Sequence, residues 1–230
     1  MSFSDIENVY LSMLKRIGAI VTDGHFVFNS GRHGSVYVNK DAVSAHTKMT
    51  FKFCIEIASE FIRDSVEVVI APATGGIALE QWVAYHLSGA MRYEVPGVYA
   101  DKEKVSLVTH EEVGTVLVPV GERFSIKRHY DKFIKGKRVL VVDDVLTTGK
   151  TARMVVEAVR ELGGKVVGLG VLCNRGGVTT KDVGGIPRIR SLVELKLDTW
   201  EEIDCALCAR GVPINTELGK GAEFLARRKG

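Results

Sequence analysis

The stretch that decides the fold is Val139–Thr151, with the sequence VLVVDDVLTTGKT. Its first four residues are all apolar, which is typical of a strand that is buried on both faces of a parallel sheet. Two adjacent carboxylates, Asp143 and Asp144, follow at the carboxyl end of that strand. Apolar residues then recur at helical spacing from Met154 onward. The stretch therefore predicts a buried strand, a polar loop and a helix.

The loop between this strand and the helix has the composition of an anion-binding site. It consists of Thr147, Thr148, Gly149, Lys150 and Thr151. Backbone N–H groups and hydroxyls at the start of a helix form a cradle for phosphate, which the helix dipole favours. The carboxylates before the loop can accept hydrogen bonds from two vicinal hydroxyls or hold a magnesium ion through water. The loop predicts a sugar phosphate or a nucleotide as ligand.

The same loop is not the phosphate-binding loop of a nucleoside triphosphatase. Gly149, Lys150 and Thr151 match the end of that motif, but the motif also needs a glycine five positions before Gly149. That position is Asp144, whose charge would repel the phosphates. The nucleoside triphosphatase interpretation therefore fails.

Strands and helices alternate on both sides of the decisive stretch. Upstream, a β-branched run at 66–70 precedes a glycine-containing turn at 71–76 and a helix that should end at Gly89. Downstream, the next helix should stop at Gly163, and a strand follows at 166–172. This order predicts an α/β fold with a mostly parallel central sheet flanked by helices, similar to a Rossmann fold.

The chain is expected to divide into three regions. Residues 1–45 form an N-terminal helix and a small antiparallel hood, residues 46–197 form the α/β core, and residues 198–230 form a C-terminal extension. Between residues 100 and 137 the periodicity weakens, with 113–120 as a candidate edge hairpin. A long segment of this kind in a compact domain is usually functional or mobile.

Composition excludes several classes of protein. The chain has 230 residues with 31 basic and 28 acidic side chains, and a net charge of +3 gives no footprint for nucleic-acid binding. The longest charge-free apolar stretch, Val68 to Leu79, is interrupted by proline and glycines and is far shorter than the roughly 20 residues of a membrane span. The N-terminus lacks the features of a secretory signal. We therefore expect a cytoplasmic protein that binds neither nucleic acid nor membranes.

The four cysteines are too few for a disulfide scaffold. Cys54 and Cys173 lie in apolar patterns and are expected in the core. Cys205 and Cys208 form a CxxC pair, but a structural zinc site would need two further ligands. The chain has no second CxxC and no HxxxH, although a symmetric partner could supply the missing ligands. Zinc therefore remains the less favoured interpretation of this pair.

The stretch Val139–Thr151 closely resembles the phosphoribosyl-pyrophosphate (PRPP) signature of type I phosphoribosyltransferases. Three further stretches are similar to the orotate phosphoribosyltransferases within that family. Residues 24–33, GHFVFNSGRH, resemble the hood segment, and residues 71–79 resemble the pyrophosphate-binding loop and its helix. Asn174 and Arg175 resemble the place where the family positions an arginine on orotate. The resemblance covers residues 4–195. In the hood segment, His25 and His33 are expected to pack in the hood or lie on its surface rather than to act as acid–base groups.

The resemblance implies a role for each matching position in binding PRPP. Asp143 and Asp144 would bind the ribose hydroxyls, and the loop from Thr147 to Thr151 would hold the 5-phosphate. Backbone N–H groups would hold the pyrophosphate at three positions of the other glycine loop: Ala73, Thr74 and Gly75.

The resemblance also implies the reaction and its requirements. Arg175 would orient orotate, and Mg²⁺ would be held mainly through PRPP oxygens, with no direct set of protein ligands. Orotate nitrogen would displace pyrophosphate at the ribose C1, giving orotidine 5′-monophosphate. The family is typically homodimeric, so a homodimer is expected.

The sequence departs from the family pattern in the mobile catalytic loop. The matching stretch, 100–104, reads ADKEK and lacks the leading arginine and the His-Gly pair of the family. Lys102 is the best candidate for a pyrophosphate contact and joins Asp143 and Asp144 as a predicted catalytic residue. Two alternatives therefore stay open. They are another type I phosphoribosyltransferase acting on a purine or other base, and a non-catalytic regulator that binds PRPP or nucleotides.

Overall fold

A six-stranded sheet forms the centre of the computed structural model, which describes residues 3–111 and 114–228. Its strands are β5 (Val68–Pro72), β6 (Gly97–Glu111), β7 (Gly114–Ser125), β8 (Arg138–Leu146), β9 (Lys165–Asn174) and β10 (Ile189–Glu194). They are ordered β10-β9-β8-β5-β6-β7, and every neighbouring pair is parallel except β6 with β7. The predicted mostly parallel α/β sheet is therefore confirmed.

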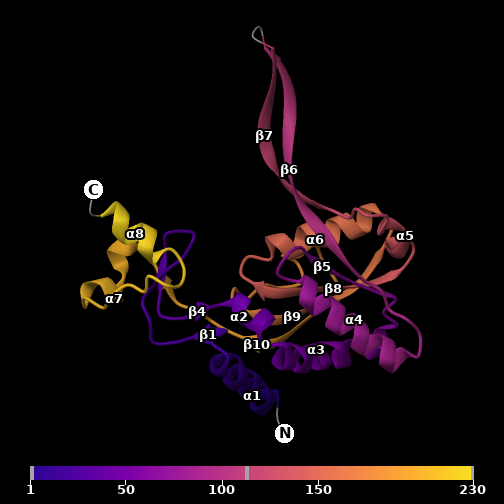
Figure 1. Ribbon diagram of the computed structural model, residues 1–230, viewed down its shortest axis with the longest axis horizontal. Helices are drawn as coiled ribbons and strands as arrows, with labels where there is room; N and C mark the ends of the chain where they lie inside the picture. The colour runs from indigo at the N-terminus through magenta and orange to yellow at the C-terminus, as the bar shows by residue number, and fades with distance from the viewer. Residues whose placement is uncertain (1–2, 112–113, 229–230) are drawn as a thin grey trace.

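Helices cover both faces of this sheet (Figure 1). They are α1 (Phe3–Arg16), α2 (Lys40–Ala45), α3 (Thr47–Phe61), α4 (Ile77–Met91), α5 (Asp131–Ile134) and α6 (Lys150–Glu161), with a 3₁₀ turn at Ile62–Asp64. In β8, Leu140 and Val142 pack in the cluster under α1, α3 and α4, whereas Val139 and Val141 pack in the cluster under α5 and α6. Because successive side chains of a strand point to opposite faces, the apolar run 139–142 fills both cores.

Two predicted boundaries in the core were wrong. Helix α4 continues through Gly89 to Met91 and ends where Arg92 takes a left-handed conformation with a φ of 60°. Strand β8 continues past the apolar run 139–142 to Leu146, so Asp143 and Asp144 lie within the carboxyl-terminal part of the strand, before the loop. No helix among the described residues is both long and apolar enough to cross a membrane.

The segment with weak periodicity is a long antiparallel hairpin, β6–β7. Its pairing runs from Asp101 opposite Ser125 to Glu111 opposite Gly114. Figure 1 shows it projecting well beyond the body of the protein. The expected edge hairpin at 113–120 is the returning strand β7, except for residue 113, which lies outside the described residues.

The hood is built from both ends of the chain. Strand β1 (Ile20–Val21) pairs with β4 (Tyr37–Val38), and β2 (Phe26–Val27) pairs with β3 (His33–Gly34). Strand β11 (Thr199–Trp200), from the C-terminal extension, adds a third strand beside β3. The extension continues as a 3₁₀ turn (Glu202–Asp204), α7 (Ala206–Ala209) and α8 (Gly221–Arg227), which Figure 1 shows beside the hood.

Candidate active site

A cavity of about 730 Å³ lies between the hood and the carboxyl ends of β5 and β8. Most of the predicted site residues line it: Ala73, Thr74, Gly75, Lys102, Asp143, Asp144, Thr147, Thr148, Thr151 and Arg175. Gly149 and Lys150 do not line it. Ligands of open α/β sheets bind in the crevice outside the carboxyl ends of the strands, so the cavity occupies the position that the fold favours.

The carboxylate pair lies at the floor of the cavity and is almost completely buried. Asp143 Oδ1 accepts a hydrogen bond from the Asp144 N–H at 2.9 Å, and Asp144 Oδ1 accepts one from the Val145 N–H at 2.7 Å. Burial, and then the neighbouring charge of Asp144, raise the pKa of Asp143 above its ordinary value. Among the described residues, the second oxygen of each carboxylate accepts no backbone hydrogen bond, and that of Asp144 faces Lys40.

Lys40 is a site residue that the sequence reasoning missed. Its Nζ lies 3.5 Å from Asp144 Oδ2, and it lines the cavity from the first residue of α2. A Cβ at Gly75 would come within 2.4 Å of Asp144 Oδ2 and 3.1 Å of Lys40 Nζ, so this contact needs glycine there. The only local signal was a polar pair, Asn39 and Lys40, directly after a short strand. Helix α2 has only six residues and was not predicted.

The phosphate cradle has the predicted form, a polar loop that enters a helix. Gly149 precedes α6 with a φ of 74°, and a Cβ there would lie 2.8 Å from Val178 Cγ1. Glycine therefore satisfies both the backbone conformation and the packing against Val178. The first-turn N–H groups of α6 have no intrahelical acceptors, and Thr147, Thr148 and Thr151 add hydroxyls at the cavity wall. This is an open, anion-favouring end of a twelve-residue helix.

The second glycine loop, which follows β5, contributes fewer donors than predicted. The Ala73 N–H donates to the Ala100 carbonyl oxygen at 2.8 Å and is therefore not free for a ligand. The N–H groups of Thr74 and Gly75 have no acceptor within the described residues, so these two remain available. The loop turns directly into α4 at Ile77.

The hood side of the cavity combines an arginine with aromatic rings. Arg175 Nε donates to Thr147 Oγ1 at 2.9 Å, and its guanidinium lies 5.5 Å from the centre of the Phe28 ring. The rings of Phe28 and Tyr37 are nearly parallel, at 13° and 6.3 Å between centroids. Gly219, from the C-terminal extension, also lines the cavity, which the sequence reasoning did not foresee. A planar anion would find a cation and a flat apolar wall here.

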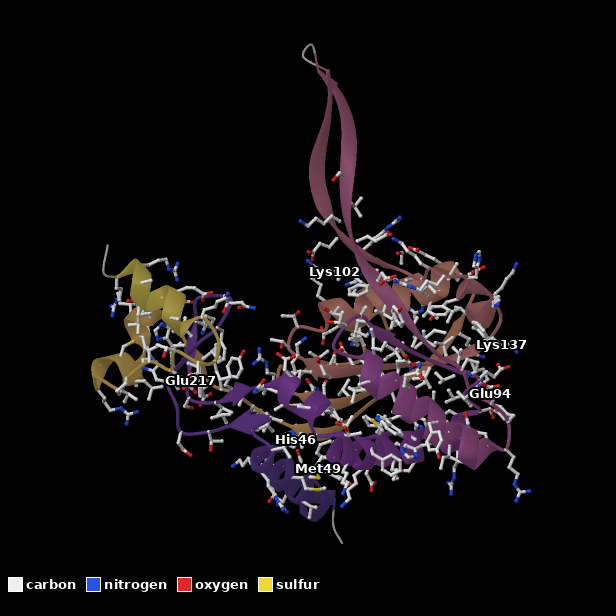
Figure 2. All side chains as sticks on the ribbon, viewed as in Figure 1. His46, Met49, Glu94, Lys102, Lys137 and Glu217 are labelled. Atoms are coloured by element: carbon white, nitrogen blue, oxygen red, sulfur yellow. The ribbon has the colours of Figure 1, made fainter. Side chains whose placement is uncertain are left out.

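Lys102 lies at the base of the β6–β7 hairpin, at the edge of the cavity (Figure 2). Its Nζ is 2.8 Å from Glu122 Oε2 on the paired strand, and both side chains are largely exposed. Exposed ion pairs contribute little stability, so this pair can open when an anionic ligand competes for the lysine.

The fold and the cavity together define a class of protein. It is an α/β protein whose cavity combines a buried acidic pair, an anion-favouring loop at the start of a helix, and an arginine beside aromatic rings. The acidic pair suits sugar hydroxyls, the loop suits a phosphate, and the arginine with the rings suits a planar anionic group.

The chain belongs to the phosphoribosyl transferase domain family, whose model matches residues 43–205. It is 35% identical over 203 residues to the orotate phosphoribosyltransferase of Pelotomaculum thermopropionicum, covering 88% of this chain and 92% of that protein. It is 32% identical over 195 residues to that of Caldanaerobacter subterraneus subsp. tengcongensis, covering 85% and 88%. The crystal structure of orotate phosphoribosyltransferase from Aeropyrum pernix matches with a TM-score of 0.54 and 28% identity, covering 80% and 93%. The predicted family and enzyme class, a pentosyltransferase, are confirmed.

Proposed function

We propose that the chain is an orotate phosphoribosyltransferase. It would transfer the 5-phosphoribosyl group of PRPP to orotate and release orotidine 5′-monophosphate and pyrophosphate, a step of pyrimidine nucleotide biosynthesis. The observation that carries this proposal is a single cavity lined by the acidic pair, the phosphate cradle and Arg175 beside Phe28. The similarity to proteins named orotate phosphoribosyltransferase supports the same conclusion.

PRPP would extend along the floor of the cavity. The open oxygens of Asp143 and Asp144 accept hydrogen bonds from the ribose hydroxyls. The 5-phosphate binds in the loop from Thr147 to Thr151, where hydroxyls and first-turn N–H groups of α6 converge. The free N–H groups of Thr74 and Gly75 donate to the pyrophosphate.

Orotate would bind at the hood end, because that end offers a cation and an aromatic surface. The guanidinium of Arg175 can donate two parallel hydrogen bonds to the orotate carboxylate. The Thr147 hydroxyl already holds the guanidinium by its Nε, which leaves the terminal nitrogens for the ligand. The Phe28 ring would pack beside the pyrimidine ring.

The chemical step exchanges one bond at the ribose C1. The orotate nitrogen gives up its proton to solvent or to the departing pyrophosphate and supplies an electron pair to C1. The C1–O bond to pyrophosphate breaks, and its electron pair leaves with the pyrophosphate. The transition state has oxocarbenium character, so the protein positions the reactants and stabilises the charge of the leaving group. Lys102 and the N–H groups of Thr74 and Gly75 are the donors placed for that charge.

Magnesium fits this cavity as a partner of PRPP rather than as an ion held by the protein alone. Asp143 and Asp144 provide carboxylate oxygens, the ligand type that magnesium prefers. Among the described residues, however, no group of three or more metal-ligating side chains gathers at the cavity. The bound ion would neutralise charge on the pyrophosphate. Lys40, 3.5 Å from Asp144 Oδ2, balances the acidic pair from the other side.

We further propose that the protein forms a homodimer, as is typical of its family. Tyr85 on α4 is 64% exposed and its ring contacts Trp82 edge-on, which provides an apolar surface for association. Light scattering coupled to size exclusion tests this proposal, and a monomer at all concentrations would contradict it.

The decisive test is the loss of orotate absorbance when the protein is mixed with orotate, PRPP and Mg²⁺, with pyrophosphate measured in parallel. We expect equal amounts of orotate consumed and pyrophosphate released. Adenine, guanine, hypoxanthine and uracil serve as competing bases. Preference for a purine would instead make the chain another phosphoribosyltransferase. Binding of PRPP without turnover of any base would make it a regulatory protein.

A further inference from the structure

Four potential metal ligands converge in the hood, away from the active-site cavity. They are His25 and His33 from the N-terminal part of the hood and Cys205 and Cys208 from the C-terminal extension. One ligand atom from each residue lies within 4.8 Å of all the others. Three of the residues are buried and Cys208 is partly buried, so the cluster is enclosed. None of the four lines the active-site cavity.

Three of the separations within the cluster match those between the ligands of a tetrahedral ion, and a fourth is about half an ångström short. Metal–ligand distances of about 2.3 Å to sulfur and 2.0–2.1 Å to nitrogen place tetrahedral ligand atoms about 3.3–3.8 Å apart. His25 Nε2 lies 3.6 Å from Cys205 Sγ and 3.7 Å from Cys208 Sγ, and His33 Nδ1 lies 3.4 Å from Cys208 Sγ. The two ring nitrogens are 2.8 Å apart. They would have to separate by only about half an ångström to join the same ion.

Hydrogen bonding orients His25 as a ligand. Its Nδ1 lies 2.8 Å from the Val212 carbonyl oxygen, and because a carbonyl can only accept, the ring proton must be on Nδ1. The lone pair of a neutral His25 is therefore on Nε2, the atom that faces the cluster. Histidines that bind metals usually donate their other N–H in this way to a carbonyl or carboxylate.

Without an ion, the polar atoms of the cluster are poorly satisfied. His25 Nε2 can accept a hydrogen bond from His33 Nδ1 at 2.8 Å, but the two thiols, which are weak donors and weak acceptors, have only ring nitrogens at 3.4–3.7 Å as contacts within the cluster. The thiols of Cys205 and Cys208 are reduced and face the lone pair of His25. An ion would accept the lone pairs of two nitrogens and two sulfurs at once.

The hood consists of short elements that a cross-link would stabilise. Its strands β2, β3 and β11 have two residues each, and helix α7 has four. Elements this short bury too little apolar surface for much stability, and small units of this kind often use a disulfide or a metal. Because the ligands come from the two ends of the chain, binding an ion would stabilise the folded hood directly.

We propose that His25, His33, Cys205 and Cys208 form a structural zinc site that fixes the C-terminal extension to the hood. Two imidazoles and two thiolates in a closed tetrahedral set are a donor set that suits zinc. The spacing between the histidines is longer than the three to five residues of ordinary zinc-finger pairs. The hairpin β2–β3 brings them together instead. This site is separate from the magnesium of the proposed reaction.

The test is the metal content of untagged protein purified without added zinc, measured by plasma mass spectrometry. We expect one zinc ion per chain in the wild type and only the buffer background in Cys208→Ser. His129→Ala, which removes an exposed histidine outside the cluster, should keep the full zinc content. After stripping and reloading with cobalt(II), the wild type should show the intense visible bands of a tetrahedral ion and a thiolate charge-transfer band.

The same experiment can overturn the proposal without reference to catalysis. Wild type that contains no zinc and takes up no cobalt has no metal site. Cys208→Ser with undiminished zinc would place the ion elsewhere. Titration of only two thiols in the denatured, unreduced wild type would show a Cys205–Cys208 disulfide instead. Because zinc content and cobalt spectra of the wild type suffice, the test stands even if the serine variant does not fold.

Discussion

The phosphate cradle of the core and the four-residue cluster of the hood are polar sites built in opposite ways. The cradle and its acidic pair come from one continuous stretch, Val139–Thr151. The cluster joins residues as much as 183 positions apart, His25 and Cys208. The cradle is open to solvent at Thr147 and Thr148, whereas the cluster is enclosed. Open sites suit exchanging substrates and closed tetrahedral sites suit structural ions, so the two regions should respond differently to mutation.

The largest expected effect is the loss of activity when the acidic pair beside the phosphate cradle is changed. Asp144→Asn should lower kcat/KM by about 100-fold or more, because one acceptor for a ribose hydroxyl becomes a mixed donor and acceptor. The fold should persist, since the change also removes one charge from a buried acidic pair. Steady-state kinetics and circular dichroism measure both effects.

Asp131→Asn, on the surface helix α5, is the matched control for Asp144→Asn and should behave as wild type. Zinc content should be unchanged in both variants. Wild-type rates in Asp144→Asn would remove the acidic pair from the mechanism.

The next largest effect should distinguish the orotate end of the cavity from the PRPP end. Arg175→Ala should raise KM for orotate by roughly 10–100-fold, because a charge-assisted contact to a carboxylate is lost. KM for PRPP should change far less. Initial rates with each substrate varied in turn measure the difference, and equal increases for both substrates would place Arg175 away from the base.

Glu80 is a buried carboxylate outside both sites, and it should affect the stability of the protein. Burial raises the pKa of Glu80 to about 8, and Glu80 Oε2 has no hydrogen-bond partner among the described residues. Between the ordinary carboxyl pKa and that value, the native state holds a proton that the unfolded chain has lost. The free energy of unfolding therefore falls as the pH rises through this window.

Glu80→Gln does not titrate, so it should gain about 1–3 kcal/mol relative to wild type between about pH 5 and pH 9. Urea denaturation at several pH values measures the difference. Glu94→Gln, an exposed change at the end of the molecule opposite the hood in Figure 2, is the control. A constant difference across the pH range would mean that Glu80 is not protonated in the native state.

The smallest expected effect on catalysis comes from the hood cluster. Cys208→Ser should raise KM for orotate only several-fold, roughly 1 kcal/mol, with kcat nearly unchanged. The reason is indirect: the extension carries Gly219 to the cavity, and the Lys220 N–H donates to the Val27 carbonyl at 2.7 Å, next to Phe28. Kinetics with orotate varied, compared with His129→Ala, measure it. A loss of kcat as large as that of Asp144→Asn would contradict the separation of the two sites.

Sequence patterns predicted those parts of the fold that depend on burial of consecutive residues. The run 139–142 fills both cores, so its apolar character was visible without a structure. The full length of the hairpin β6–β7 was not predicted, because most of it projects beyond the body of the protein, where burial in the core does not impose a periodic pattern. Helix α4 passes Gly89 because Leu79, Val83 and Leu87 anchor it in the core, which offsets the low helix propensity of glycine.

The candidate site divides in the same way. The acidic pair, the polar loop and Arg175 could be predicted because each lies at or just after the carboxyl end of a strand. Lys40 and Gly219 could not, because they reach the cavity from a six-residue helix and from an irregular segment near the C-terminus. The engaged N–H of Ala73 could not be foreseen either, since its acceptor is on the neighbouring strand β6.

By itself, the sequence determined the alternating core, the polar loop that enters α6 and the family, because these depend on residues that are close together in the chain. Only the tertiary structure decided that Lys40 faces Asp144 and that the C-terminal extension completes the hood. It also decided that two isolated histidines meet a CxxC pair. The physical reason is that periodicity and helix dipoles act over a few residues, whereas a tetrahedral set of ligands is specified by packing between distant segments.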